Sequence, residues 1–332
     1  MDKTGIKQRK PAIRIHKIPI MSDYWGRRFK RPLRSELLQE TIRRYFSNPD
    51  NALLSSIEKL QRRNYGLKDL RTVTAGLFQE GEYAYVFRVH VETADGRKSW
   101  FAMIIAKNEG PMSRAAKLEH ENLKRLRERC KNIVAQSLEG GPMTLLGTGP
   151  TSVYTYFTVW LHRFHELGVQ HKTMNFYINE LPFQYFDSRL TDAIKARMLA
   201  LMFRLYDPLR REAIEPPRVG AGDFVITRKG PHELKLVACR RILKGVSLDR
   251  CIARYLGYYG SWGSRLFHFV PDDTALLRRA LIEGLVVSHG YGAEQVFLAL
   301  KRYRDSLAGL KAHQEEWTPL PTLNKLLSQG LA

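Results

Sequence analysis

The sequence predicts an α+β fold in two lobes, with an antiparallel sheet in the first half and mainly helices in the second. In the first half, stretches rich in aromatic and β-branched residues follow one another at residues 72–78, 83–92 and 98–107. In the second half, apolar residues recur at helical spacing over residues 190–205, 248–255, 274–287 and 293–310. We therefore expect three parts: a basic flexible arm (1–34), N-terminal helices with a sheet lobe (35–165), and a helical lobe with a central hairpin (166–332).

The sheet lobe is expected to begin with two helices. Residues 35–46 form the first, and the second ends at Arg63 and has one apolar face for docking. After the three predicted strands, the apolar spacing predicts a helix over 113–131. A connection rich in glycine and proline, 140–150, then leads to a fourth predicted strand over 152–164.

The helical lobe is interrupted by one predicted hairpin. Residues 222–227 and 234–240 have the composition of strands, and they flank Arg228-Lys229-Gly230-Pro231, a turn signal. The hairpin comes directly after the predicted core helix 190–205, so the two are expected to lie in one lobe.

Charge is the extreme feature of the composition. The 332 residues contain 54 Lys and Arg against 33 Asp and Glu, a net charge of +21. Residues 1–34 hold eleven of the cations and two of the acids, which gives this arm +9. Such a field favours an anionic partner, either nucleic acid, an acidic protein or an anionic membrane surface. A solvated tail that only aids solubility is the alternative.

Cysteine content and hydropathy exclude several classes of protein. The three cysteines, Cys130, Cys239 and Cys251, have no CxxC spacing, so neither a disulfide framework nor a cysteine zinc site is supported. The longest apolar stretches fall short of the roughly 20 residues that cross a bilayer. The N-terminal residues are too basic, and their apolar residues too interrupted, for a signal peptide. We expect a cytoplasmic protein without a transmembrane segment.

Lys107 stands at the end of the most apolar predicted strand. Period-two alternation places it on the same face as Met103 and Ile105. The turn between the first two strands contains a single glycine, Gly81, which lets backbone amides approach an anion. An ordinary hairpin turn is the alternative at Gly81.

Glu119 is expected on the packing face of the helix 113–131. At about 100° per residue it shares that face with Leu123 and Leu126. An acid on a packing stripe is costly unless it is paired, so a cation should lie opposite, and Lys107 is the nearest candidate. In the alternative, Glu119 reaches solvent or pairs with a surface cation such as Arg114.

Charged residues also flank the predicted hairpin. Gly222-Asp223 precedes its first strand, and Cys239-Arg240-Arg241 follows its second. A turn carboxylate that accepts nearby backbone amides is the structural alternative for Asp223. The two arginines either bind an anion or line a surface.

The order of these elements resembles the protein-kinase-like superfamily, in particular its aminoglycoside and choline phosphotransferase branch, over about residues 70–310. The resemblance implies that Lys107 and the Gly81 turn bind the phosphates of ATP and that Glu119 holds Lys107 in place. It also implies that Asp223 accepts the proton of the acceptor hydroxyl or, counted from the hairpin turn, serves as a magnesium ligand.

The sequence departs from that family at the metal site. Cys239 and Arg240 stand where the family has its metal-binding aspartate, and hard cations need oxygen ligands. Arg240 and Arg241 then become candidate phosphate contacts that neutralise charge directly.

Two functional hypotheses follow. In the first, the chain is a kinase-like nucleotide-binding protein that transfers a phosphoryl or nucleotidyl group from ATP with magnesium if it is active, and is otherwise a pseudokinase binding module. In the second, it is a nucleic-acid-associated basic protein without catalysis. That protein would use the arm 1–34 and cations of the helix 113–131: Arg114, Lys117, Lys124, Arg125, Arg127 and Arg129.

Overall fold

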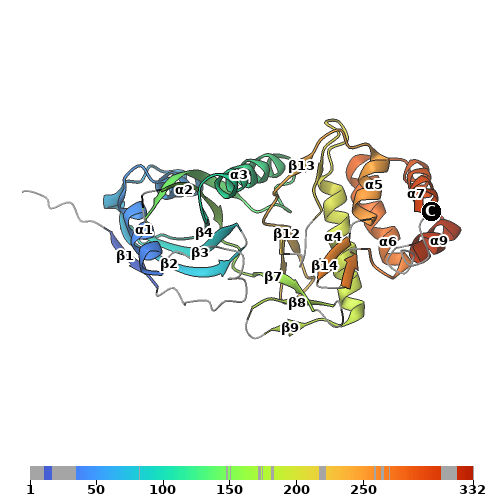
Figure 1. Ribbon diagram of the computed structural model, residues 1–332, viewed down its shortest axis with the longest axis horizontal. Coiled ribbons are helices and arrows are strands. Elements are labelled where there is room, and N and C mark those ends of the chain that lie inside the picture. The colour runs from blue at the N-terminus through green and yellow to red at the C-terminus, as the bar shows by residue number, and fades with distance from the viewer. Residues whose placement is uncertain are drawn as a thin grey trace, which may run out of the picture. The chain divides into compact units, whose positions relative to one another are not determined.

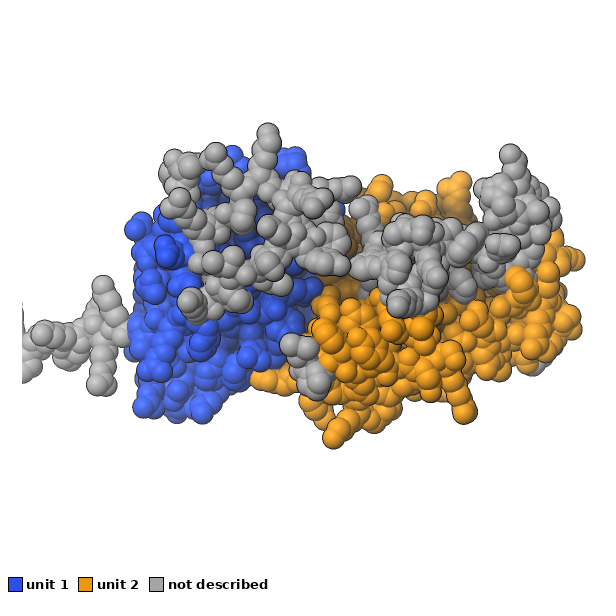
Figure 2. Space-filling model, turned by 60° about the horizontal axis from the view of Figure 1, so that its bottom comes forward, with its two compact units in different colours: residues 1–125, 135–161 blue, residues 126–134, 162–332 orange. Residues whose placement is uncertain are grey.

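The computed structural model has an α+β fold, as predicted. It describes residues 11–16, 35–81, 83–146, 149, 151–170, 173, 175–180, 183–216, 222–257, 259–262, 265–268, 270–307 and 320–331. The chain divides into two compact units (Figures 1 and 2). Unit 1 comprises residues 1–125 and 135–161, and unit 2 comprises residues 126–134 and 162–332.

Unit 1 is built on a six-stranded sheet in the order β1-β2-β3-β4-β6-β5. Its strands are β1 (Ala12–Ile15), β2 (Leu70–Glu80), β3 (Ala84–Thr93), β4 (Lys98–Ala106), β5 (Ser137–Leu145) and β6 (Thr151–Val159). All neighbouring pairs are antiparallel except β1 with β2. The alternation of side chains fills the core with fully buried residues such as Val73, Phe87, Phe101 and Phe157.

The helices of unit 1 are α1 (Ser35–Ser47), α2 (Ala52–Gln61) and α3 (Pro111–Arg129), and a short 3₁₀ turn, η1 (Leu67–Asp69), leads into β2. Helix α1 contacts β1 and β5, and α2 contacts β5 and β6. Asn51 caps α2 by accepting hydrogen bonds from the amides of Leu53 and Leu54. The predicted helices 35–46 and 113–131 are thus confirmed to within a few residues.

Strand β5 corrects the expected Gly-Pro connection over 140–150. Gly140 is required inside this strand, since a Cβ there would lie 2.7 Å from Cβ of Tyr156 and 2.9 Å from the ring of His120. Pro142 is tolerated because β5 is the edge strand of the sheet. Close packing by a larger neighbour therefore explains the glycine that suggested a loop.

Part of the predicted arm is a strand. Residues 12–15 pair in parallel with β2, from Ala12 opposite Thr72 to Ile15 opposite Ala75. The other residues of the arm, except Pro11 and His16, lie outside the described residues.

Unit 2 contains a five-stranded sheet in the order β12-β11-β7-β8-β9. Its strands are β7 (Phe164–Val169), β8 (Phe176–Ile178), β9 (Gln184–Tyr185), β11 (Phe224–Thr227) and β12 (Leu234–Leu236). β11 and β12 form the predicted antiparallel hairpin, with Phe224 opposite Leu236. The predicted strand 152–164 proves to be two segments, because β6 ends at Val159 and β7 belongs to unit 2.

The helices of unit 2 are α4 (Ser188–Leu205), α5 (Leu248–Leu256), α6 (Thr274–Leu281), α7 (Ala293–Leu307) and α9 (Leu320–Gln329). The predicted helix 274–287 continues from α6 into a π-helical turn, η3 (Ile282–Val287). Helix α4 is the core helix and contacts α5, α6 and η3.

Two short strand pairs complete unit 2. They join β10 (Ala213–Ile214) to β13 (Ile242–Leu243), and β14 (Tyr259–Trp262) to β15 (Arg265–His268). Within the described part of the chain, no helix has the length and apolar character to cross a membrane.

Candidate functional site

Lys107 directly follows β4, and its ammonium group is held by neighbouring strands of unit 1. Its Nζ lies 2.6 Å from Glu80 Oε1 on β2 and 5.1 Å from the ring centre of Tyr85 on β3. The Lys107 side chain is only 13% exposed. Its backbone N–H donates to the Tyr83 carbonyl, and that of Gly81 donates to a carbonyl of β3. The structure therefore brings Lys107 and the single-glycine turn together, with Glu80 between them.

Glu119 lies on the packing face of α3. Its Oε1 accepts a hydrogen bond of 2.6 Å from the hydroxyl of Tyr156 on β6, and Leu123 and Leu126 on the same helix are buried. The carboxylate that the structure gives Lys107 is that of Glu80, which the sequence analysis did not assign to it. The pairing of Glu119 with Lys107 stays a prediction.

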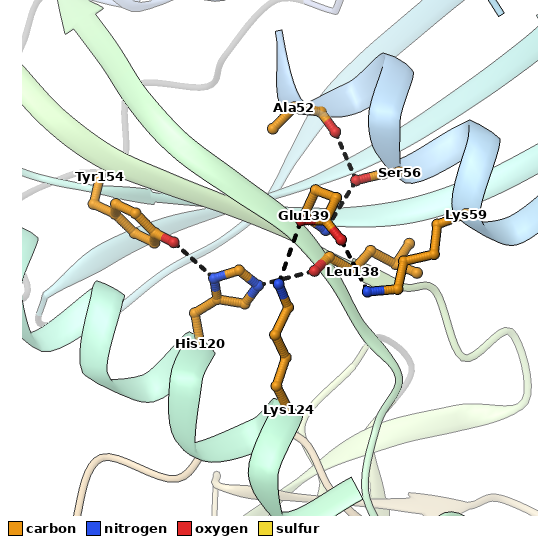
Figure 3. A network of polar contacts seen from close by, with 8 residues as sticks. All are labelled: Ala52, Ser56, Lys59, His120, Lys124, Leu138, Glu139 and Tyr154. Atoms are coloured by element: carbon orange, nitrogen blue, oxygen red, sulfur yellow. Dashed lines mark hydrogen bonds and ion pairs between the residues drawn. The ribbon is translucent and has the colours of Figure 1, made fainter. Parts of the chain in front are cut away.

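A polar network fastens α2 and α3 to β5 (Figure 3). The Glu139 carboxylate lies 2.9 Å from Lys59 Nζ on α2 and 3.4 Å from Lys124 Nζ on α3. Its backbone N–H also donates to the hydroxyl of Ser56. Burial opposes ionisation of Glu139, but the two ammonium groups hold its pKa below the ordinary value. The network thus fixes the helix that carries Glu119.

His120 forms the buried end of this network (Figure 3). Its Nε2 lies 3.1 Å from the Leu138 carbonyl, which can only accept, so Nε2 carries the proton. Nδ1, 2.7 Å from the hydroxyl of Tyr154, then accepts from it. Burial lowers the pKa of His120 to about 4, so the ring is neutral near pH 7 and joins helix to sheet.

Asp223, Arg240 and Arg241 line one small hollow of unit 2. Arg240 Nη2 lies 3.2 Å from Asp223 Oδ1, and Arg241 Nη1 lies 3.9 Å from Glu215 Oε1. The Asp223 carbonyl accepts from the amide of Val237, which ties the start of β11 to the chain after β12. The hollow holds about 10 Å³, close to the space of one water molecule. The structure therefore brings these three residues together.

Glu166 is a further acid near Asp223. It lies opposite Val225 in the pairing of β7 with β11, and one carboxylate oxygen accepts from the Asn179 amide. The other oxygen lies 2.7 Å from the position that a Cβ on Gly222 would take. Gly222 therefore permits this close approach. Sequence reasoning missed Glu166 because the pairing joins strands far apart along the chain.

The residues around Asp223 do not fit a magnesium ion. Magnesium requires near-octahedral oxygen ligands, whereas the Asp223 carboxylate faces the guanidinium of Arg240. The chain after β12 supplies Cys239 beside that arginine. Among the residues with described positions, no group of three or more His, Cys, Asp or Glu side chains could hold a metal ion.

Several cations of α3 that the nucleic-acid hypothesis uses have partners within the chain. Lys124 pairs with Glu139, and Arg129 Nη1 lies 2.8 Å from Asp207 Oδ2. Arg127 donates to the Val134 carbonyl. Lys124 thus joins α3 to β5, Arg127 holds the turn after α3, and Arg129 joins the end of α3 to the chain after α4.

No protein-family model matches this sequence, and no curated protein matches it either. Its function is therefore inferred from the residues and contacts described above.

Proposed function

We propose that this chain is a kinase-like nucleotide-binding protein in which Lys107 contacts the phosphates of ATP. The observation that carries the proposal is the surroundings of Lys107. A partly buried ammonium at the end of a central strand is held by Glu80 and Tyr85 beside a glycine turn. A lysine oriented in this way is a point charge suited to a phosphate.

The order of elements in unit 1 supports the same proposal. Strands β2 to β4 are consecutive and antiparallel, α3 follows β4, and β5 and β6 then extend the sheet beside β4. This is the arrangement expected of the N-terminal lobe in a protein-kinase-like fold. Glu119 on α3 faces that sheet and remains the candidate that positions Lys107.

The role of unit 2 is proposed from Asp223. In an active enzyme, the Asp223 carboxylate accepts the proton of the acceptor hydroxyl. Because the surrounding side chains do not fit magnesium, we derive no step through that ion. Arg240 and Arg241 remain candidate phosphate contacts. The side chains around Asp223 favour a binding module of the pseudokinase type.

Thermal shift with ATP tests the proposal on the full chain. ATP should raise the Tm of the wild type. At a hundredfold excess over Kd, bound ATP should stabilise the folded state by about 2.7 kcal/mol. Lys107→Met should lose the part of this shift that Lys107 provides, measured against its own ligand-free Tm. Lys98→Met, at the other end of β4, is the matched control and should keep it.

The result with magnesium refines the outcome. We expect the same shift in EDTA as in magnesium, since the residues around Asp223 do not fit the ion. No shift in the wild type, or equal shifts in the wild type and Lys107→Met, would contradict nucleotide binding at Lys107.

Nucleic acid binding through residues 1–34 is the second candidate, favoured by the +9 charge of that arm. Contacts of this kind make log K fall linearly with log salt. A chain lacking residues 1–10, which carry Lys3, Lys7, Arg9 and Lys10, should therefore show a shallower salt slope with single-stranded RNA. An unchanged salt slope would show that these four cations do not contact the RNA.

A further inference from the structure

A second hollow in unit 2, which we name the basic hollow, is lined almost entirely by one short segment. It encloses about 430 Å³, open to solvent, and its lining consists of Arg241, Ile242, Leu243, Lys244, Gly245, Val246, Arg250 and Arg254. Four of these eight residues are cations and none is an acid.

The backbone of the basic hollow is held in place from several sides. β13 pairs with β10, and the Val246 amide donates to the Arg211 carbonyl. The hydroxyl of the buried Tyr206 donates to the Val246 carbonyl. Ser247 then caps α5 by accepting from the amide of Arg250. The four cations therefore project from a fixed frame.

Of the four cations, Arg241 lies 3.9 Å from Glu215, and the other three have no acid partner among the described residues. The side chains of Lys244, Arg250 and Arg254 make no ion pair or hydrogen bond with any residue of the described part of the chain, and all three are exposed. The nearest acid along the segment, Asp249, accepts two hydrogen bonds from Arg302 instead.

Two local rules are broken on α5. Arg250 stands in the first turn, where the helix macrodipole favours acids, and Arg254 lies four residues on, where like charges repel. Sequence choices that oppose local stability without a local gain are typical of functional sites. A bound anion that contacts both arginines would offset the repulsion between them.

We propose that the basic hollow binds a small molecule that carries two or more phosphate groups. Its volume lies within the roughly 300–1,000 Å³ usual for small-ligand pockets. Three arginines offer forked donors that match phosphate oxygens, and Lys244 adds a point charge. The site goes beyond the proposed function, because it requires neither Lys107 nor ATP.

Arg241 connects this site to Asp223. It lines both the basic hollow and the hollow that contains Asp223 and Arg240. A phosphate bound by Arg241 therefore lies next to the candidate proton acceptor of unit 2.

Calorimetric titration with inorganic tripolyphosphate, at constant ionic strength, tests the proposal on the full chain. Arg254→Glu should weaken binding at least tenfold. Lys325→Glu makes the same change of charge at an exposed position on α9, outside the basic hollow, and should weaken binding less than twofold. Undetectable binding to the wild type, or equal losses in both variants, would overturn the proposal. Arg254→Ala should also weaken binding and guards against a folding defect caused by the glutamate.

Competition separates the sources of the phosphates. Displacement of tripolyphosphate by fructose 1,6-bisphosphate indicates a soluble ligand. Displacement by phosphatidylcholine vesicles that contain phosphatidylinositol bisphosphate, and not by plain vesicles, indicates a lipid headgroup. Displacement by single-stranded RNA alone, with neither small phosphate effective, would overturn the small-molecule site in favour of nucleic acid.

Failure of this inference is distinguishable from failure of the proposed function. Lys107→Met should bind tripolyphosphate as the wild type does, and Arg254→Glu should keep the thermal shift that Lys107 gives with ATP. If Arg254→Glu removes the ATP shift while Lys107→Met keeps it, the nucleotide site at Lys107 is wrong and the basic hollow stands.

Discussion

The cations of unit 1 and those of the basic hollow in unit 2 have opposite surroundings. In unit 1, Lys107 has the Glu80 carboxylate at 2.6 Å, and Lys59 and Lys124 share Glu139. In the basic hollow, Arg241 lies 3.9 Å from Glu215, and the other three cations have no ion pair with any residue whose position is described. A carboxylate partner holds a cation in a fixed position, whereas a group of cations without acid partners among the described residues keeps its full charge for a ligand.

This difference separates two kinds of charge within a very basic chain. A net charge of +21 states only that some anion is favoured. The partners of each side chain show where that attraction is still available.

The largest effect is expected at Gly140, which fits the His120 network against β6. Gly140→Val should lower the free energy of unfolding by about 3 kcal/mol or more, because its side chain would overlap Tyr156 and His120. Gly141→Val is the matched control, since no atom lies within 4 Å of its Cβ position. Urea denaturation measures both, and equal losses would contradict the packing described for β5.

Acidification should weaken the same network. The pKa of His120 is about 4 in the folded protein, below the ordinary 6.5, so the unfolded chain takes up the proton first. Stability from this residue is then complete above about pH 6.5 and falls as the pH drops to 4, by up to about 3 kcal/mol. His120→Gln should flatten that part of the stability profile measured by urea denaturation. An unchanged slope would show that His120 is not the group responsible.

Removing the partner of Lys107 should have an intermediate effect. Glu80→Gln leaves a mostly covered ammonium without its carboxylate and should cost about 1–2 kcal/mol. The more exposed pair of Arg71 with Glu92 provides the comparison, and Glu92→Gln should cost less than about 1 kcal/mol. If both variants lose the same free energy of unfolding, the burial of Lys107 does not make its ion pair more important for stability.

The smallest effect is expected in the basic hollow, and it has the opposite sign. Arg250→Ala should raise stability by about 0.3 kcal/mol at low salt, since it removes a repulsion on α5. The gain should disappear at 1 M salt, where charges are screened within about 3 Å. Thermal unfolding at the two salt concentrations measures it. A loss of stability at low salt would mean that Arg250 has a favourable partner.

Local patterns predicted most of the longer elements. Alternation and turn signals predicted β2, β3, β4 and the hairpin of β11 with β12. In these strands the type of side chain depends on which face is buried, so the pattern can be seen in the sequence. The same reasoning failed for β5, where Gly140 serves packing. It also missed two-residue strands such as β10 and β13, whose pairing depends on contacts across the fold.

The candidate site was predicted in part for the same reason. Asp223, Arg240 and Arg241 meet because a hairpin joins them, and hairpins are local. Glu166 was not assigned because its pairing with β11 joins strands far apart along the chain. Glu80 was not assigned to Lys107 because the two residues are 27 positions apart and meet across β3, the strand between β2 and β4. One feature of the sequence indicates the basic hollow: residues 240–254 contain five cations and a single acid.

The short strand β1 changes how the basic arm has to be studied. A chain that starts at residue 35 loses the four residues that cover the outer edge of β2, together with the arm's charge. Unpaired backbone amides and carbonyls on such an edge invite another copy of the protein to add a strand. Self-association of that truncated chain would then imitate, or hide, the loss of an anionic partner. A chain cut after residue 10 keeps β1 paired with the edge of β2.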